Sequence, residues 1–327
     1  MPSYRSEVPL AMAAPALAQR LGLGMLGAGM HERLGARIGD DAAQGLWARA
    51  FGARGAVGVR SGDDAARLQG FGRHGPSYEM RSSGLLLGRD LLRQDRDGAS
   101  ERAGLYAGLG RIDGDVQAVY GGKAGTVVMD GYALGAYWSR VGDTGWYADG
   151  TLQGMRYDRV RMQSVQGERL RTGGWGLAAS LEGGYTYALG NGWTAVPQAQ
   201  LIYQRSQLAG ASDSFGQVRF GGANAAYLRL GARMQRDGAG QMPALWLRAD
   251  LWRAMGPGAK TTLTTLDGSH PVSLRTGLGR SWAQVGAGFT GPLGPRARLT
   301  GSLDYSQGFE TRRDHAVTGR VLLTVQW

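Results

Sequence analysis

The 327-residue sequence has no cysteine, only ten prolines and no long apolar run. The absence of cysteine excludes disulfide frameworks and thiolate metal sites. A helix that crosses a bilayer needs about 20 consecutive apolar residues. The best uncharged candidate, residues 21–30, has only ten, and four of them are glycine. If this chain enters a membrane, it therefore does so as strands.

Lysine is also scarce, because arginine supplies all of the 37 basic residues except Lys123 and Lys260. Against 26 acidic residues the formal net charge is +11, which alone would suggest an anionic partner such as nucleic acid. The arginines, however, are dispersed at alternate positions and form no basic stripe. We therefore expect no nucleic-acid partner.

A period of two runs from Leu46 to the end of the chain, as in strands whose successive side chains point to opposite faces. Glycine, with 57 residues, is scattered through these apolar stretches and forms no linker. The pattern predicts twelve strands, at residues 46–57, 78–92, 101–112, 126–140, 145–158, 172–189, 193–206, 224–236, 243–254, 278–290, 296–306 and 316–327.

Charged side chains share one face of these strands. An arginine on a lipid-facing wall at mid-bilayer costs about 2 to 4 kcal/mol, so the charged face is expected to point inward. There the charges would set ion selectivity in an empty channel, hydrogen-bond a helix placed inside, or simply be solvated. The predicted lumen-facing residues are Glu182, Gln200, Arg229, Arg233, Arg248, Asp250, Arg298 and Asp304.

The last strand ends on Trp327 with no turn after it. Because open edges recruit other chains, we expect this strand to pair with the first one and close a barrel, with Trp327 at a membrane interface. Short turns are expected after the even strands and long polar loops after several odd ones, which is the layout of an outer-membrane barrel. The long loops are predicted at residues 58–77, 159–171, 207–223 and 254–277.

Only residues 1–44 have a helical pattern, which divides the chain into a leading segment, 1–44, and a barrel, 45–327. Four glycines would cost a free helix roughly 3 to 4 kcal/mol relative to alanine, so this helix needs a tight sleeve. A helix is about 10 to 12 Å across, and a twelve-stranded barrel should hold one helix and little more. A secretory signal peptide is the alternative, although Arg5 and Glu7 precede the apolar part.

Cofactor and metal motifs are weak. Gly22, Gly24 and Gly27 match the dinucleotide fingerprint G-x-G-x-x-G, but no strand precedes them. The four histidines have no metal-pair spacing. We expect no cofactor and no metal site.

Catalytic motifs are equally sparse. A hydrolase site would have to lie at the outer rim, where Asp63, Asp64 and His74 share one predicted loop and Ser269 adjoins His270. Serine and aspartate are common in loops by chance, so we expect no enzyme activity.

Several segments together carry a family resemblance. They are residues 4–10 (Tyr-Arg-Ser-Glu-Val-Pro-Leu) with Pro15, the helix that ends in His-Glu-Arg at 31–33, the strand at 47–52 and the alternating C-terminus at Trp327. Over essentially the whole chain this combination resembles the translocator domain of a classical autotransporter, the pertactin type of type V secretion.

The resemblance implies an all-β fold, a twelve-stranded antiparallel transmembrane β-barrel of the bacterial outer membrane with an N-terminal α-helix inside the pore. It implies a monomer in outer-membrane lipid that exports a covalently linked N-terminal passenger, with its last strand recognised by the barrel-assembly machinery. The residues that match the assembly signal are Val321, Leu323, Val325 and Trp327. The pore helix matches residues 10–37, with Leu10, Leu17, Leu21, Leu26 and Leu34.

Some relatives cut themselves at an asparagine near that helix. The first asparagine here is Asn191, so we expect any cut to lie upstream of Met1 or to be made by another protease. No passenger is present, and we expect Met1 to begin a recombinant or processed fragment. The alternatives are a stand-alone, porin-like channel whose first 40 residues form a periplasmic or disordered extension, and a barrel hydrolase.

Overall fold

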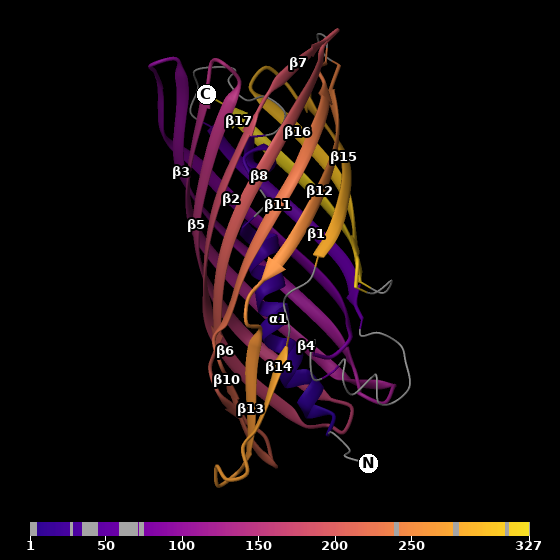
Figure 1. The fold of residues 1–327 in the computed structure, drawn as a ribbon. Helices are drawn as coiled ribbons and strands as arrows, with labels where there is room; N and C mark the ends of the chain where they lie inside the picture. The colour runs from indigo at the N-terminus through magenta and orange to yellow at the C-terminus, as the bar shows by residue number, and fades with distance from the viewer. Residues whose placement is uncertain are drawn as a thin grey trace.

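The computed structural model describes residues 5–26, 29–34, 45–58, 71, 75–238, 242–276, 281–310 and 314–326. A large antiparallel sheet closes into a barrel around a helix, and a second, small sheet extends one end (Figure 1). The N-terminus emerges at that same end, at the foot of Figure 1.

Twelve spans of the described chain form the barrel, which confirms the predicted fold class. Each has the alternating pattern that favours a half-buried strand. They are β1 (Gly45–Val57), β2 (Tyr78–Arg96), β3 (Ala99–Gln117), β4 (Lys123–Gly142), β5 (Trp146–Ser164), β6 (Arg169–Tyr185) continued by β7 (Tyr187–Gly190), β8 (Trp193–Leu208), β11 (Ala223–Arg236), β12 (Ala244–Met255), β15 (Ser281–Pro292), β16 (Ala297–Gly308) and β17 (His315–Gln326).

The barrel closes between its first and last strands. β17 pairs with β1 in one continuous antiparallel register, from Gly45 opposite Gln326 to Ala56 opposite His315. Every other barrel strand pairs with its neighbours in chain order. The expected closure is therefore confirmed, and no open edge of the large sheet remains along this seam.

In the middle of the barrel the outer wall is apolar and the bore is polar. On β12, Leu247 is 61% exposed on the outside, whereas the next residue, Arg248, is 8% exposed inside. The same alternation separates Leu303 from Asp304 on β16. This arrangement suits a wall that faces hydrocarbon, because the charges are kept away from lipid.

At the end of the barrel where the N-terminus emerges, apolar side chains point into the bore and charged side chains point outward. The register between β5 and β6 shifts between Tyr157 and Val160, and Arg159 takes a left-handed φ of 47°. Beyond this bulge Val160 lies buried in the bore, whereas Arg161 is exposed outside. The prediction that charged residues point inward is therefore wrong here, because this part of the wall faces water and not hydrocarbon.

The connections are sorted between the two ends as expected, but three predicted loops are wrong. β5 and β6 continue through residues 159–171 and leave only residues 165–168 as the turn. The predicted loops 207–223 and 254–277 contain short strands that form a separate sheet beyond the wall. These strands are β9 (Ala211–Ser212), β10 (Gly216–Phe220), β13 (Ala259–Thr265) and β14 (Val272–Thr276), and they form the second sheet in the order β14-β13-β10-β9.

The leading segment forms two helices, α1 (Glu7–Leu26) and α2 (His31–Leu34). The predicted single helix over residues 10–37 is wrong, since Gly29 between them has a φ of 132° that a helix does not allow. Arg37 lies outside the described residues. Neither described helix combines the length and apolar character required to cross a bilayer.

Candidate functional site: the occupied bore

Apolar contacts seat α1 against one wall of the bore. A Cβ at Gly114 of β3 would lie 2.7 Å from Leu17 Cδ1, and one at Gly131 of β4 would lie 2.9 Å from Leu21 Cδ2. These glycines thus form recesses for the helix leucines. The predicted pore-helix leucines within α1 are at most 2% exposed: Leu10, Leu17, Leu21 and Leu26. The remaining one, Leu34, belongs to α2, and its side chain lies outside the described part of the chain.

Polar side chains of the wall donate hydrogen bonds to backbone carbonyls of α1. The pairs are Thr276 to Met12 (3.0 Å), Tyr157 to Ala18 (2.9 Å), Gln204 to Gln19 (3.0 Å), Gln153 to Gly22 (3.1 Å) and Arg49 to Met25 (2.7 Å). Arg49 also satisfies a carbonyl of the last turn, which has no partner within the helix. The bonds come from β14, β5, β8 and β1, so they fix both the depth and the rotation of α1.

Ion pairs hold α2. Arg33 is buried, pairs with Asp149 of β5 and donates to Thr151 Oγ1 at 3.0 Å. Glu32 accepts a hydrogen bond from Arg248 of β12 at 2.9 Å and lies 3.6 Å from Arg320 of β17. These contacts tie α2 to three separate strands. Removal of one partner of such a buried pair would leave an uncompensated charge in the bore.

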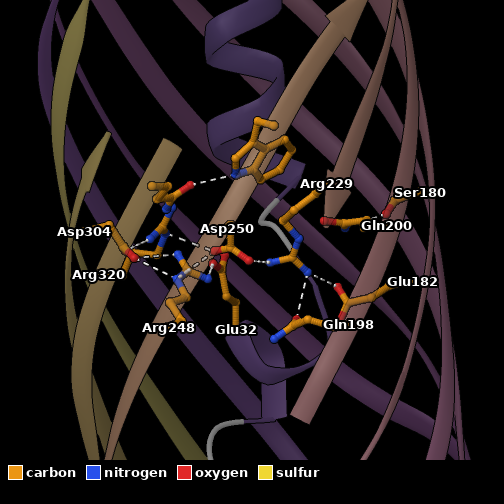
Figure 2. A network of polar contacts seen from close by, with 12 residues as sticks. Glu32, Ser180, Glu182, Gln198, Gln200, Arg229, Arg248, Asp250, Asp304 and Arg320 are labelled. Atoms are coloured by element: carbon orange, nitrogen blue, oxygen red, sulfur yellow. Dashed lines mark hydrogen bonds and ion pairs between the residues drawn. The ribbon is translucent and has the colours of Figure 1, made fainter. Parts of the chain in front are cut away.

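Figure 2 shows the charged layer that crosses the bore around Glu32. Arg248 contacts Asp304 at 2.7 Å, and Arg320 pairs with the other oxygen of the same carboxylate. Asp250 lies 3.7 Å from Arg248. Two arginines and three carboxylates from α2, β12, β16 and β17 therefore compensate one another inside the barrel.

The layer continues on the opposite side of Asp250 (Figure 2). Arg229 of β11 lies 3.7 Å from Asp250 and donates to Glu182 at 2.8 Å and to Gln198 at 3.0 Å. Tyr147 donates a further hydrogen bond to Glu182 at 2.8 Å. Five of the predicted lumen-facing residues thus belong to one connected network: Glu182, Arg229, Arg248, Asp250 and Asp304.

The other three predicted lumen-facing residues are Gln200, Arg233 and Arg298. Gln200 is buried and donates to Ser180 Oγ at 2.8 Å. Arg233 is buried and donates to Gln235 at 3.2 Å. Arg298 is half-buried, in the even-numbered set of β16 to which Asp304 belongs.

α1 lies mainly against β3, β4 and β5 and leaves space on the other side of the bore. A cavity of about 250 Å³ remains there, between α1 and a wall that includes β1, β12 and β15–β17. Trp252 and Trp282, whose rings stack with centroids 5.3 Å apart, border it, and so does Arg320. The helix therefore sits off-centre in the bore.

The C-terminal strand presents its predicted assembly residues on the outer wall. Val321 is 51% exposed, and Leu323 and Val325 are half-buried in β17. Trp327 lies outside the described residues, so its predicted place at the membrane interface stays a prediction.

The loop pair Ser269 and His270 lies in the exposed turn between β13 and β14. Ser269 Oγ is 2.8 Å from His270 Nδ1 and donates to Asp267 at 2.8 Å. In a catalytic triad the acid orients the histidine, whereas here it accepts hydrogen bonds from the Thr265 and Ser269 hydroxyls, which lower the pKa of Asp267 to about 2. The Thr265 and Ser269 hydroxyls therefore stabilise the turn through their hydrogen bonds to Asp267. The other candidates lie outside the described residues: Asp63, Asp64 and His74.

Within the described ranges no group of three or more metal-ligating side chains comes together. Gly22 and Gly24 lie inside α1 and face Gln204 and Phe51, not a turn between a strand and a helix. Gly27, the third glycine of the apparent dinucleotide fingerprint, lies outside the described residues.

A closed antiparallel barrel with an apolar outer wall and a polar bore defines an outer-membrane barrel, here filled by its own N-terminal helix. The model of the autotransporter beta-domain matches residues 46–304. The chain belongs to the autotransporter beta-domain family and is a translocator domain of the bacterial outer membrane.

Two curated relatives show how much of a longer protein this chain represents. It is 34% identical over 216 residues to the BrkA autotransporter of Bordetella pertussis, an alignment that covers 63% of this chain and 19% of that protein. It is 28% identical over 289 residues to the pertactin autotransporter of Bordetella bronchiseptica, which covers 85% of this chain and 28% of that protein. The chain thus spans only about a fifth to somewhat over a quarter of these relatives.

Solved structures share the fold. The beta domain of the Bordetella autotransporter BrkA superimposes with a TM-score of 0.61 at 24% identity, over 88% of this chain and 100% of that one. The transport unit of AIDA-I from Escherichia coli gives a TM-score of 0.73 at 14% identity over 99% and 100%. The translocator domain of NalP from Neisseria meningitidis gives 0.70 at 14% identity over 96% and 97%.

Proposed function

We propose that this domain exports a passenger joined to its N-terminus, and that α1 occupies the bore as the trailing segment of that passenger. The observation that supports this is the direction of α1: its first residue lies at the end with the long connections, where the N-terminus leaves the barrel (Figure 1). Long loops face the cell exterior in outer-membrane barrels, so a passenger attached upstream would lie outside the cell. The domain then acts by transport and not by catalysis.

The stand-alone channel hypothesis needs the first 40 residues outside the barrel. The described residues of that segment, 5–26 and 29–34, lie inside, bonded to the wall through contacts such as Arg49 to Met25 and Arg33 to Asp149. These contacts support the proposal that the bore is a conduit occupied by its last cargo segment.

Accessibility of two tags in intact cells tests the proposal. An epitope fused before Met1 is expected to be cleaved by added protease, whereas the same epitope inserted at the Asn191–Gly192 turn is expected to be protected. The turn lies at the opposite end of the barrel and joins β7 to β8. A protected N-terminal tag together with a cleaved turn tag would show that the barrel has the opposite orientation in the membrane, and would refute export.

The same proposal includes the bounds of the two segments, the recognition of β17, the oligomeric state and the lipid environment. Residues 1–44 form the trailing segment and 45–327 the barrel domain. The barrel-assembly machinery recognises the outward residues of β17, which are presented next to the seam with β1. The domain works as a monomer in outer-membrane lipid, because its closed wall leaves no strand edge at the seam.

A further inference from the structure

Three exposed arginines gather on the outer wall of β5 and β6, near the end where the N-terminus emerges. Arg161 of β5 lies directly opposite Arg171 of β6, and Arg169 begins β6 two residues before Arg171. Like charges in directly opposite positions of a sheet destabilise it. Such a pair is favoured when an anion lies between the two guanidinium groups.

These arginines border a groove of about 450 Å³ in the outer face. Gln163 adds an amide to its lining, and Thr126 adds a hydroxyl that donates to Asp115 at 3.2 Å. We call this feature the outer arginine groove, with Arg161, Arg169 and Arg171 as its charged members. Its concave shape, hydrogen-bond donors and positive charge match an anionic ligand with several oxygens.

The groove arginines lack the close acidic partners that basic residues have elsewhere on the same end. Lys123 lies 2.6 Å from Asp115, and Arg111 lies 3.3 Å from Asp113. Within the described chain, by contrast, none of the three groove arginines lies within 4.0 Å of a carboxylate oxygen. Three arginines without an ion-pair partner in the described chain therefore gather beside a single carboxylate hydrogen-bonded to the groove lining, that of Asp115.

The groove also lies at the depth of lipid headgroups. Tyr132 and Trp175 are 47% and 43% exposed on the outer wall, as expected for an aromatic belt at a membrane interface. Arg171 precedes Trp175 by four residues in β6, on the side of the N-terminal end of the barrel. At about 3.3 Å per residue and a strand tilt of 35–45°, its Cα lies roughly 10 Å above that belt.

We propose that the outer arginine groove binds the phosphate groups of a phosphorylated glycolipid in the outer leaflet. Guanidinium groups bind phosphate through paired N–H donors, and the apolar wall below the groove receives the acyl chains. The assignment rests on the proposed orientation of the barrel, but binding by purified protein can be measured without export.

Binding by the full chain in detergent micelles tests this. The probes are a lipid-anchored glucosamine disaccharide with two phosphates, its dephosphorylated form, and inorganic phosphate. One variant replaces the three groove arginines with glutamine. A control removes the same charge from the same end of the barrel by Arg111→Gln, Arg159→Gln and Arg253→Gln. Each arginine at a membrane surface contributes about fivefold, so the groove variant should bind the phosphorylated glycolipid on the order of 100-fold more weakly, and the control like the parent.

Three results would overturn the proposal: an unchanged affinity in the groove variant, an equal loss in the control, or equal binding of the dephosphorylated lipid. Inorganic phosphate that binds as tightly as the glycolipid would make the groove a site for soluble anions instead. A gel-mobility shift between heated and unheated samples checks that each barrel is folded. If the groove variant does not fold, Arg171→Gln alone should show about a fivefold loss. Lost binding in a variant that still exports a passenger separates this site from the transport function.

Discussion

The recess at Gly114 gives a sharp test of how α1 is held. Gly114→Ala alone should destabilise the docked helix, because the new methyl group would lie 2.7 Å from Leu17 Cδ1. Leu17→Ala alone should also destabilise it by opening a cavity. Together the two substitutions should compensate, since the methyl group introduced on β3 would enter the space that the leucine leaves.

The magnitudes follow from packing. Overpacking costs about 1 to 3 kcal/mol, and truncation of a fully buried leucine costs about 3 kcal/mol. In the Leu17→Ala background, Gly114→Ala should stabilise by about 0.8 kcal/mol, the value of one buried methyl or methylene group. The effect of Gly114→Ala thus changes sign, with a coupling free energy of about 2 kcal/mol or more.

The assay is native-state proteolysis of residues 5–34 in a series of urea concentrations, which reports the free energy of releasing the helix from the bore. Gly52→Ala is the matched control, because nothing lies within 4 Å of a Cβ there. If Gly114→Ala behaves like Gly52→Ala, or if the two effects simply add, the helix does not use this recess.

Three further outcomes are expected. Arg49→Leu should lower the free energy of helix docking by about 1 to 3 kcal/mol in the same assay, because it leaves a carbonyl of the last α1 turn unpaired. Leu247→Arg should block insertion into the outer membrane at a cost of about 2 to 4 kcal/mol, whereas Arg248→Leu should insert but unfold at a lower temperature; equal insertion of both would contradict the assigned faces. Deletion of Trp327 should reduce assembled barrel in membrane fractions much more than Gln200→Ala, and equal losses would mean that the terminal ring is not recognised.

The strands were predictable because one physical constraint governs most of the wall. Lipid outside and water inside impose an alternation that is visible in segments such as 245–251 and 299–305. The constraint ends where the wall leaves the membrane, and there the prediction failed: residues 159–171 were expected to be a loop. The bulge at Arg159 shifts the phase of the pattern at the same point, so no single period describes that hairpin.

The contacts of the site were only partly predictable. Charged inward positions such as Arg229 could be identified from strand phase, but their partners depend on which strands meet across the bore. Glu32 and Arg33 had appeared only as a charged helix end, and their roles follow from the break near Gly29 that places α2 beside β5 and β12. The inward direction of Arg49 could have been predicted, since this charged residue lies between Ala48 and Ala50 in β1.

The off-centre seat of α1 has a consequence for leakage across the outer membrane. The helix lies against one side of the bore, while the cavity on the other side is lined in part by Arg320. Ion pairs between Glu32 and its arginines cross the bore at that level, in addition to the apolar packing and hydrogen bonds that seat α1. Because these charged groups are largely buried, dissolved salt screens their attraction only weakly, so the resting leak should increase with ionic strength no more steeply than the conductivity of the solution does.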